Sequence, residues 1–402
     1  MPSVTLHDLG IEMKNDNYKY GGYGWDGENV YIADLTDLAF CINIKNKTVW
    51  TTQINLPDVS GNFRMVFANK QRDNFCMDLI ARATNNTFRR YRVLYKQTEQ
   101  TVEVTQIWES ASDNDISYGL LKGQVISREF ALIPMPNKPY IFYLDLRDGA
   151  FEKFDTGFGN YNPRIGHGVF VTKDDIILLL GKHYSGDNFK KFSVYSRSIS
   201  DIPNSSPDGD SPNPANGFEL HLIDKHYVCA TGGTVSGSNP PLVWFDSKLE
   251  LLGKTDISTV QSNPHNYGLL AIGKDSNGYI LVIAVMLNNH MSNANNMKIA
   301  LLRVNPDTWE IANYDILLDT SIMVECAVGS PYSSRENLPI IDTRNKKVYT
   351  IARETEYSAN PKRLYIVEFD MSDVDIEEWN QNAYFVGVPR IPTTLTLTIT
   401  PL

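Results

Sequence analysis

Residues 41–52 read CINIKNKTVWTT, which is an apolar strand, a tight polar turn centred near Asn46 and a second strand. Runs of this kind, bounded by turn-forming residues, are typical of β-hairpins. The same arrangement recurs as RVLYKQTEQTVEVT, IFYLDLRDGAFEKF, FSVYSRSISDI, LVWFDSKLELLG, ALLRVNPDTWEI and LYIVEFDMSDVDIEEW, with turns near Thr98, Asp148, Arg197, Ser247, Asp307 and Ser372. The spacing of about 50 residues through most of the chain indicates an internal repeat, and the copies number seven.

A second hairpin precedes many of these copies. The examples are GYGWDGENVYIAD, GVFVTKDDIILLLG, FELHLIDKHYVCATGG, LLAIGKDSNGYILVIAV and LPIIDTRNKKVYTIAR. Helical periodicity is almost absent, so one unit is four antiparallel strands, and radial repetition of such units leaves only short protected edges. The sequence therefore predicts an all-β fold, a seven-bladed β-propeller of four-stranded antiparallel blades with an extra C-terminal β-strand. We expect an N-terminal lead-in strand at 1–17, the propeller at 18–380 and a tail strand at 381–402.

Two of the units resemble kelch-type propeller blades. HYVCATGGTVSGSNPPLVWFDSKLELL carries the paired glycines Gly232 and Gly233 at the end of the second strand of its unit, and RVNPDTWEI is similar to the family's turn followed by a tryptophan, Trp309. The glycine doublet is missing at the matching place in most other units. The resemblance implies a kelch-like propeller fold and brings no activity with it, because propellers host unrelated functions.

Composition limits the classes of partner. With 42% hydrophobic residues and a formal charge of -10, the chain is globular and has no basic cluster, which argues against a nucleic-acid partner. The apolar run Ile280 to Leu287 fits a buried strand, so no membrane insertion is expected. Widely spaced cysteines are interpreted as small buried hydrophobes; they are Cys41, Cys76, Cys229 and Cys326. The first residues, MPSVTLHDLG, lack a secretory signal, although a signal already removed would leave no trace, so localisation stays unknown.

The connections between strands are unequal. Turns within each hairpin are tight, whereas the connections between the hairpins are long and emerge together on the other side of the sheets, where a binding surface is expected. Their Asn, Ser, Gly and Tyr content suits adaptable recognition, or simply reflects the preference of Asn, Ser and Gly for turns. The candidate ligand-binding residues are Tyr23, Trp25, Arg164, His167, His183, His265, His290, Arg335 and Arg353.

No catalytic residue, metal site or cofactor is predicted. The histidines lack metal-ligand spacing, and the nucleophile motif G-x-S-x-G is absent. Paired carboxylates such as Asp113 with Asp115 lie in no apolar setting that would raise a pKa.

The last twelve residues, IPTTLTLTITPL, alternate threonine with aliphatic residues. The strand residues are Thr394, Leu395, Thr396, Leu397, Thr398 and Ile399. Three interpretations stay open: a ring-closing or edge strand that pairs with the N-terminal SVTLHDLGIEM, a disordered tail, or a strand added to another chain.

The favoured function is a non-catalytic binding or assembly protein. It recognises a protein or glycan through the long loops and docks to a protein partner, or self-assembles, through the C-terminal strand. Tails of this composition resemble segments of microbial surface and virion proteins, which favours a structural or adhesive role on a virion or cell surface over a cytoplasmic one. The alternatives are a propeller enzyme, a glycan- or ester-acting hydrolase or lyase with its site at the central channel mouth, and an intracellular adaptor.

Overall fold

The computed structural model describes most of the chain, and all of the secondary structure in this part is β-strand. The described residues are 2–389 without 14–19, 35–37, 57, 60–63, 72–73, 117–123, 126–128, 135–139, 156–162, 172–175, 183–189, 194–195, 197, 205–217, 224, 232–240, 263, 289–295, 323, 326–338 and 355–361. Contacts divide the chain into two compact units. Unit 1 comprises Met1–Tyr18, Ile44–Lys47 and Arg164–Gly387, and unit 2 comprises Lys19–Asn43, Thr48–Pro163 and Val388–Leu402.

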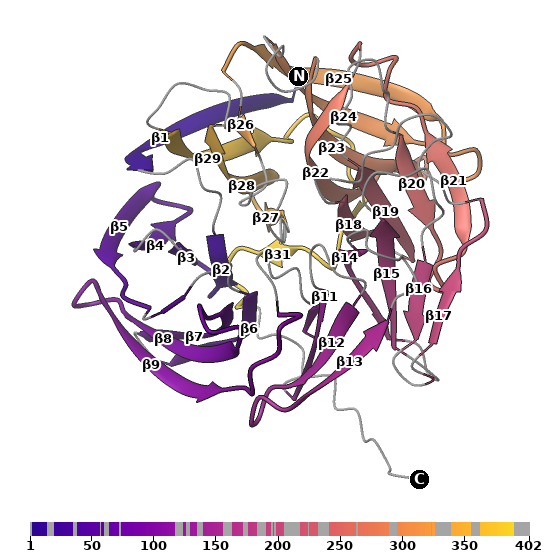
Figure 1. Cartoon of the computed structure of the whole chain (residues 1–402). Coiled ribbons are helices and arrows are strands. Elements are labelled where there is room, and N and C mark those ends of the chain that lie inside the picture. Colours follow the sequence, from indigo (N-terminus) through magenta and orange to yellow (C-terminus); the bar gives the residue numbers. More distant parts are fainter. Residues whose placement is uncertain are drawn as a thin grey trace. The chain divides into compact units, whose positions relative to one another are not determined.

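Unit 2 holds three antiparallel sheets, each with its four strands paired in chain order (Figure 1). The first is β2 (Tyr20–Trp25), β3 (Asn29–Asp34), β4 (Leu38–Asn43) and β5 (Thr48–Gln53). The second is β6 (Arg64–Gln71), β7 (Asn74–Arg82), β8 (Phe88–Lys96) and β9 (Thr101–Glu109). The third is β10 (Gln124–Val125), β11 (Phe130–Pro134), β12 (Tyr140–Asp145) and β13 (Phe151–Asp155).

Unit 1 holds four sheets. Two follow the same order: β14 (Pro163–Val171), β15 (Ile176–Lys182), β16 (Lys190–Ser193), β17 (Ser198–Asp201), and β18 (Phe218–Ile223), β19 (His226–Thr231), β20 (Leu242–Phe245), β21 (Leu251–Thr255). The third is β22 (His265–Lys274), β23 (Ile280–Leu287), β24 (Met297–Val304) and β25 (Ile311–Thr320), with β30 (Glu378–Trp379) beside β22. The fourth combines β26 (Val324–Glu325), β27 (Ile340–Asp342), β28 (Lys347–Glu354) and β29 (Lys362–Asp370) with β1 (Ser3–Met13) and β31 (Tyr384–Phe385).

These meanders give the chain an all-β, β-propeller fold, and the described strands make seven sheets. Apolar side chains on both faces of the middle strands form the cores between neighbouring sheets. All eight residues of β23 are buried, for example. The buried thiols Cys41 and Cys76 confirm the interpretation of these two cysteines, and burial raises the pKa of both. No described helix has the length and apolar character needed to cross a membrane.

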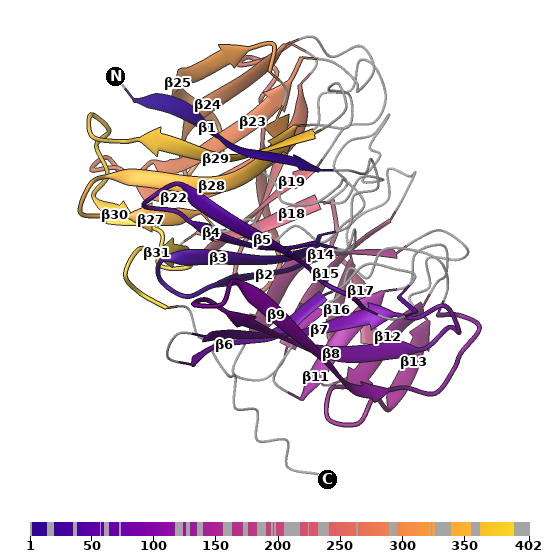
Figure 2. The same cartoon turned by 90° about the vertical axis from the view of Figure 1, so that its left-hand side faces the viewer.

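The prediction that LYIVEFDMSDVDIEEW is a hairpin is wrong. β29 pairs with β28 on one side and with the N-terminal β1 on the other, with Ser3 opposite Asp370 and Met13 opposite Lys362. Figure 2 shows β1 running beside β29. The residues expected as the outer strand instead form β30, which pairs with Gly273 and Lys274 of β22. The outer strand of the last sheet therefore comes from the other end of the chain.

The segment after β29 follows the inner edges of two sheets. At Gly273 an added Cβ would overlap the carbonyl oxygen of Glu378, so the close approach of β30 requires glycine. The buried Asn380 donates from its backbone N to Ile272 O at 2.8 Å and from Nδ2 to Ala271 O at 3.0 Å. Further on, β31 pairs in parallel with β27. The predicted tail strand at Thr394–Ile399 lies outside the described residues.

Candidate functional site

Three connections between strands of unit 2 meet at one end of its sheets. They are residues 54–59 between β5 and β6, the short connection at residues 83–87 between β7 and β8, and residues 110–116 after β9, with residue 57 outside the described part. Their backbones bond to one another, because Thr84 N donates to Asp58 O at 2.9 Å and Asp113 N to Asn86 O at 3.1 Å. We call this group, residues 58, 82–89 and 109–116, the loop end.

The connection at 83–87 is a tight five-residue turn. Ala83 N donates to Thr87 O at 2.9 Å, and Asn86 has a left-handed backbone with φ of 58°. Asparagine adopts this conformation more readily than most residues. The side chain of Arg82 holds the turn from within, since Nη2 donates to Asn86 Oδ1 at 2.8 Å and Nε to Ile116 O at 3.1 Å. The turn is thus fixed by both its backbone and a buried arginine.

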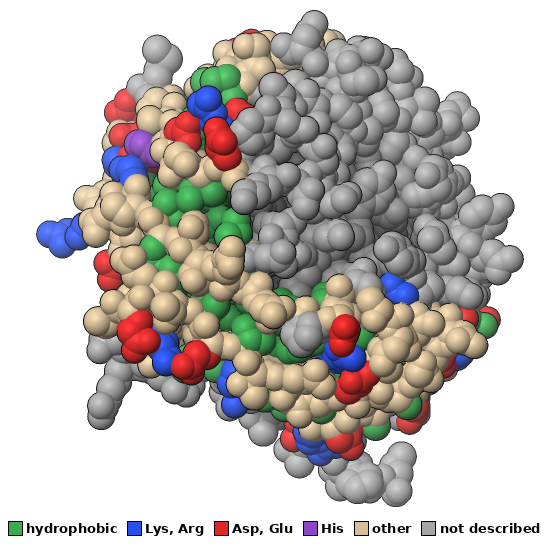
Figure 3. Space-filling model, turned by 60° about the vertical axis from the view of Figure 1, so that its left-hand side comes forward, with side chains coloured by type: hydrophobic (Ala, Val, Ile, Leu, Met, Phe, Trp, Pro, Cys, Tyr) green, Lys and Arg blue, Asp and Glu red, His purple; other side chains and the backbone are tan. Residues whose placement is uncertain are grey.

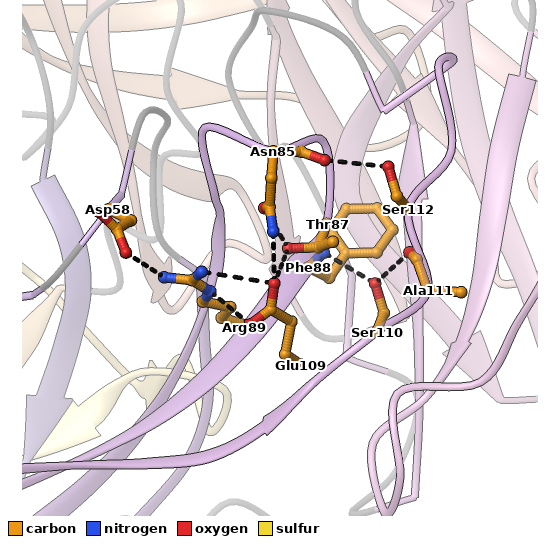
Figure 4. Close-up of polar contacts among 9 residues, drawn as sticks. All are labelled: Asp58, Asn85, Thr87, Phe88, Arg89, Glu109, Ser110, Ala111 and Ser112. Atoms are coloured by element: carbon orange, nitrogen blue, oxygen red, sulfur yellow. Dashed lines mark hydrogen bonds and ion pairs between the residues drawn. The ribbon is translucent and has the colours of Figure 1, made fainter.

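Arg89 is the centre of the loop end (Figure 4). It is only 8% exposed, and its guanidinium lies 3.1 Å from Glu109 Oε2 and 3.4 Å from Asp58 Oδ2. Its contact with Tyr91 and that with Glu109 raise the pKa of Arg89. A buried charge needs such partners, because an unpaired one is costly to desolvate. The arginine therefore joins the β5–β6 connection to the end of β9.

Glu109 is shared by a second set of bonds. Its Oε1 accepts from Asn85 Nδ2 at 2.6 Å and from Thr87 Oγ1 at 2.9 Å. These bonds and the Arg89 charge outweigh the effect of burial and lower the pKa of Glu109, with the Asn85 bond contributing most. The carboxylate is ionised at neutral pH and holds the turn at 83–87 against β9.

Two serines complete the arrangement seen in Figure 4. Ser110 Oγ accepts from Phe88 N at 2.9 Å, and Ser112 Oγ donates to Asn85 O at 2.9 Å. Close by, Lys153 Nζ lies 3.3 Å from Asp113 Oδ2 and 2.6 Å from Asp115 Oδ2. The paired carboxylates noted in the sequence thus share a lysine. The polar side chains of the loop end therefore form hydrogen bonds with one another and with the backbone, and these bonds order the exposed loops.

Of the predicted ligand-binding residues, the structure describes the side chains of two, Trp25 and Arg353. The Trp25 side chain is 2% exposed and donates from Nε1 to Val388 O at 3.1 Å, beside the tight turn between β2 and β3. Trp25 therefore lies at the end of its sheet that carries the tight turns, because these turns and the long connections lie at opposite ends of antiparallel strands; a ligand-binding role for it stays a prediction. Arg353, at the end of β28, is 2% exposed.

For the other candidates the structure gives a backbone position or none. Tyr23 is on β2, Arg164 and His167 are on β14, and His265 begins β22. His183, His290 and Arg335 lie outside the described residues. A ligand-binding role for these residues stays a prediction.

Arg89 and Glu109 were missed by sequence reasoning. The available signal was FRRYR at 88–92, which places three arginines in a strand flanked by apolar residues. Arginine is almost never fully buried unless paired, so such a strand indicates carboxylates nearby. Asp78 forms ion pairs with the other two arginines, since its carboxylate oxygens lie 2.6 Å from Arg90 Nη2 and 2.8 Å from Arg92 Nε.

Charge on the visible face is mixed. In Figure 3 acidic and basic side chains lie next to one another in small groups, with no extended area of one sign among the coloured residues. Among the described residues, no group of three or more His, Cys, Asp or Glu side chains is arranged to hold a metal ion.

Comparisons with known proteins bear on the fold alone. No family model and no curated protein matches this chain. Among solved structures it is similar to the WD40 domain of SCAP from fission yeast, at 8% identity and a TM-score of 0.45 over 88% of this chain and 84% of that one. It is also similar to the Swd1 β-propeller domain of Myceliophteria thermophila, at 9% identity and a TM-score of 0.43 over 87% of this chain and 98% of that one. A third similar structure is a luciferin-regenerating enzyme, at 9% identity and a TM-score of 0.40 over 96% of this chain and 100% of that one. The chain is a β-propeller protein, as its strand pairing shows; the kelch-like resemblance is not confirmed.

Proposed function

We propose that this protein is a non-catalytic binding and assembly protein that recognises a protein partner through the loop end. The observation that carries the proposal is the Arg89–Glu109 network, in which a buried arginine and its carboxylates fix three exposed connections. Ordered loops lose less conformational entropy on association, so a preformed surface binds more tightly. Exposed Asn85 and Ser112 present the polar groups of this surface. A surface glycan is the second ligand class that these groups suit.

The arrangement of the whole chain is part of the same proposal. The seven sheets are taken as seven blades over residues 18–380, to which β1 adds the last outer strand. Residues 381–402 then comprise the end of the inner-edge segment and a tail whose Thr394–Ile399 stretch serves as an assembly strand. The threonine- and leucine-rich tail and the acidic composition support a place on a virion or microbial cell surface.

The test compares two positions at opposite ends of one sheet. Asn85→Arg and Ser112→Arg change the loop end, and Thr98→Arg adds the same charge at the exposed turn between β8 and β9. Each full-length protein is used to capture partners by cross-linking in cells of its source and is applied to a printed glycan array.

We expect wild type and Thr98→Arg to bind the same partner or glycan. The two loop-end variants should lose this binding or show an affinity at least about tenfold lower. Equal binding by all three variants would place the interface elsewhere. Turnover of aryl glycosides or aryl esters by the purified protein would instead support a hydrolase.

A further inference from the structure

The outer strand of the last sheet, β1, is attached differently from the other outer strands. In the six other sheets of the described chain the outer strand directly follows its partner in the sequence, as β9 follows β8 and β25 follows β24. β1 instead pairs with β29, from which most of the chain separates it. A strand that no hairpin turn links to its neighbour can leave the sheet by local unfolding while the neighbour stays folded.

The backbone ladder between β1 and β29 is interrupted. Pairing is regular from Ser3, opposite Asp370, to Asp8, and the register then shifts before Glu12. Gly10 has a left-handed backbone with φ of 67°, and its N donates to Asp8 Oδ1 at 2.8 Å. A bulge of this kind disrupts the ladder locally. Side-chain contacts therefore matter for the retention of β1.

One face of β1 is held by Glu368 of β29. This residue is 8% exposed, and its Oε2 lies 3.0 Å from His7 Nε2 and 2.8 Å from Lys47 Nζ, while Lys347 Nζ contacts its other carboxylate oxygen. All four residues belong to unit 1. Burial raises the pKa of Glu368, but the bonds from Lys347 and Lys47 outweigh burial and lower the pKa to about 2. The carboxylate is therefore ionised at neutral pH and accepts a hydrogen bond from His7.

The other face of β1 combines aliphatic packing with an exposed ion pair. Val4 and Leu6 are partly buried against the core beside β29. Arg363 Nη1 lies 3.1 Å from Asp8 Oδ2, and these two side chains are 55% and 40% exposed. Exposed pairs contribute little, whereas a buried carboxylate that loses a hydrogen-bond donor is costly. The contact between His7 and Glu368 is therefore the stronger of the two polar links.

We propose that β1 is a releasable strand, which leaves the edge of β29 while the rest of unit 1 stays folded, and that the contact between His7 Nε2 and Glu368 Oε2 is the latch that holds it. Release uncovers the backbone donors and acceptors of residues 362–370, and an open sheet edge binds an extended strand. The present occupant defines the ligand of that edge: an extended segment that alternates polar and aliphatic residues as SVTL does at 3–6. The device is separate from the loop end, which belongs to unit 2.

Hydrogen–deuterium exchange on full-chain proteins tests the release. His7→Ala and Glu368→Gln each change one side of the latch, and Ser3→Ala is the matched control, because Ser3 is exposed on the same strand. We expect β1 of wild type to exchange faster than β25, which a hairpin turn links to its sheet. Both latch variants should speed exchange in β1 at least about tenfold further and leave β25 unchanged. Ser3→Ala should behave as wild type does.

Two results of this experiment would overturn the proposal. If the latch variants speed exchange equally in β1 and β25, the contact stabilises unit 1 as a whole and β1 does not leave by itself. If they speed exchange in β1 no more than Ser3→Ala does, the contact is not the latch.

A labelled peptide with the sequence of residues 2–13 tests the opened edge. The peptide keeps His7, so it competes best with a protein whose own strand has lost the latch. Fluorescence anisotropy should show at least about tenfold tighter binding to His7→Ala than to wild type, because the free edge is more often available. A peptide of reversed sequence should bind neither protein, and chemical denaturation confirms that His7→Ala is folded. Equal binding of the peptide to both proteins, or none to either, would contradict an edge that opens by release of β1.

Discussion

The two ends of the sheets in unit 2 are held together differently. At the turn end the turn between β2 and β3 is closed by local bonds, since Asp26 Oδ1 accepts from Glu28 N at 2.9 Å and Asn29 N at 2.7 Å, and Trp25 Nε1 also donates to Val388 O in the last part of the chain. At the loop end Arg89 and Glu109 join connections that are 20 to 31 residues apart in the sequence. Local bonds only close a hairpin, whereas the long-range network maintains one arrangement of several loops. The comparison supports the proposal that the loop end is a preformed recognition surface.

The largest effect is expected at the turn end, from Trp25→Ala. This change removes a buried indole and its bond to Val388, and similar truncations cost about 3–5 kcal/mol. Chemical denaturation measures the loss in unfolding free energy. Trp25→Phe keeps most of the packing and should lose far less; equal losses would show that the bond, rather than packing, holds this end.

Replacing Arg89 with methionine should cost about 2 kcal/mol, because Glu109 and Asp58 lose the cation that they share. Arg92→Met is the control, since Arg92 is 47% exposed in its side chain and Arg90 still pairs with Asp78. Denaturation of both variants should show the smaller loss for Arg92→Met. The reverse order would contradict the central place of Arg89.

Asn85→Ala should cost about 1 kcal/mol, since it removes one donor to Glu109 and one acceptor for Thr87. The loss should be confined to the loop end. Amide exchange should quicken at the turn 83–87 and leave the turn between β2 and β3 unchanged. A uniform change along the chain would show that Asn85 acts on overall stability.

The smallest effect is a dependence on pH. The folded-state pKa of Glu109 is lowered from 4.5, so its contribution is present above pH 4.5 and is lost as the pH falls through the lower folded value. For a carboxylate that is 30% exposed, this contribution should stay below about 1 kcal/mol. Glu109→Gln should flatten this part of the stability curve, and an unchanged curve would contradict the assignment.

The sequence predicted the hairpins well because a hairpin is a local structure. Copies such as CINIKNKTVWTT and ALLRVNPDTWEI became β4–β5 and β24–β25, since turn residues and alternation lie within a dozen positions. The pairing of β1 with β29 joins residues 3 and 370, and no local pattern specifies such a partner. The two-residue strands β30 and β31 are too short to carry any periodicity.

The loop end was predictable only as a region. The connection that follows β9 is one of the long connections expected to carry the binding surface, and its sequence WESASDNDIS supplies Glu109, Ser110 and Ser112. Its network depends on side chains from three connections meeting in space, which sequence spacing does not encode. The sequence analysis instead selected histidines as ligand-binding residues, because the imidazole side chain can take part in binding and in acid–base chemistry.

Hydrogen–deuterium exchange on the full chain, without any partner, tests the central claim most directly. A preformed loop end predicts slow exchange at the bonded amides of Thr84, Asn86, Ser110 and Asp113, comparable with that of the turn amides of Asp26 and Asn29. Exchange of the loop-end amides at the rate of free peptide would show that the surface does not exist before binding, and would contradict the account.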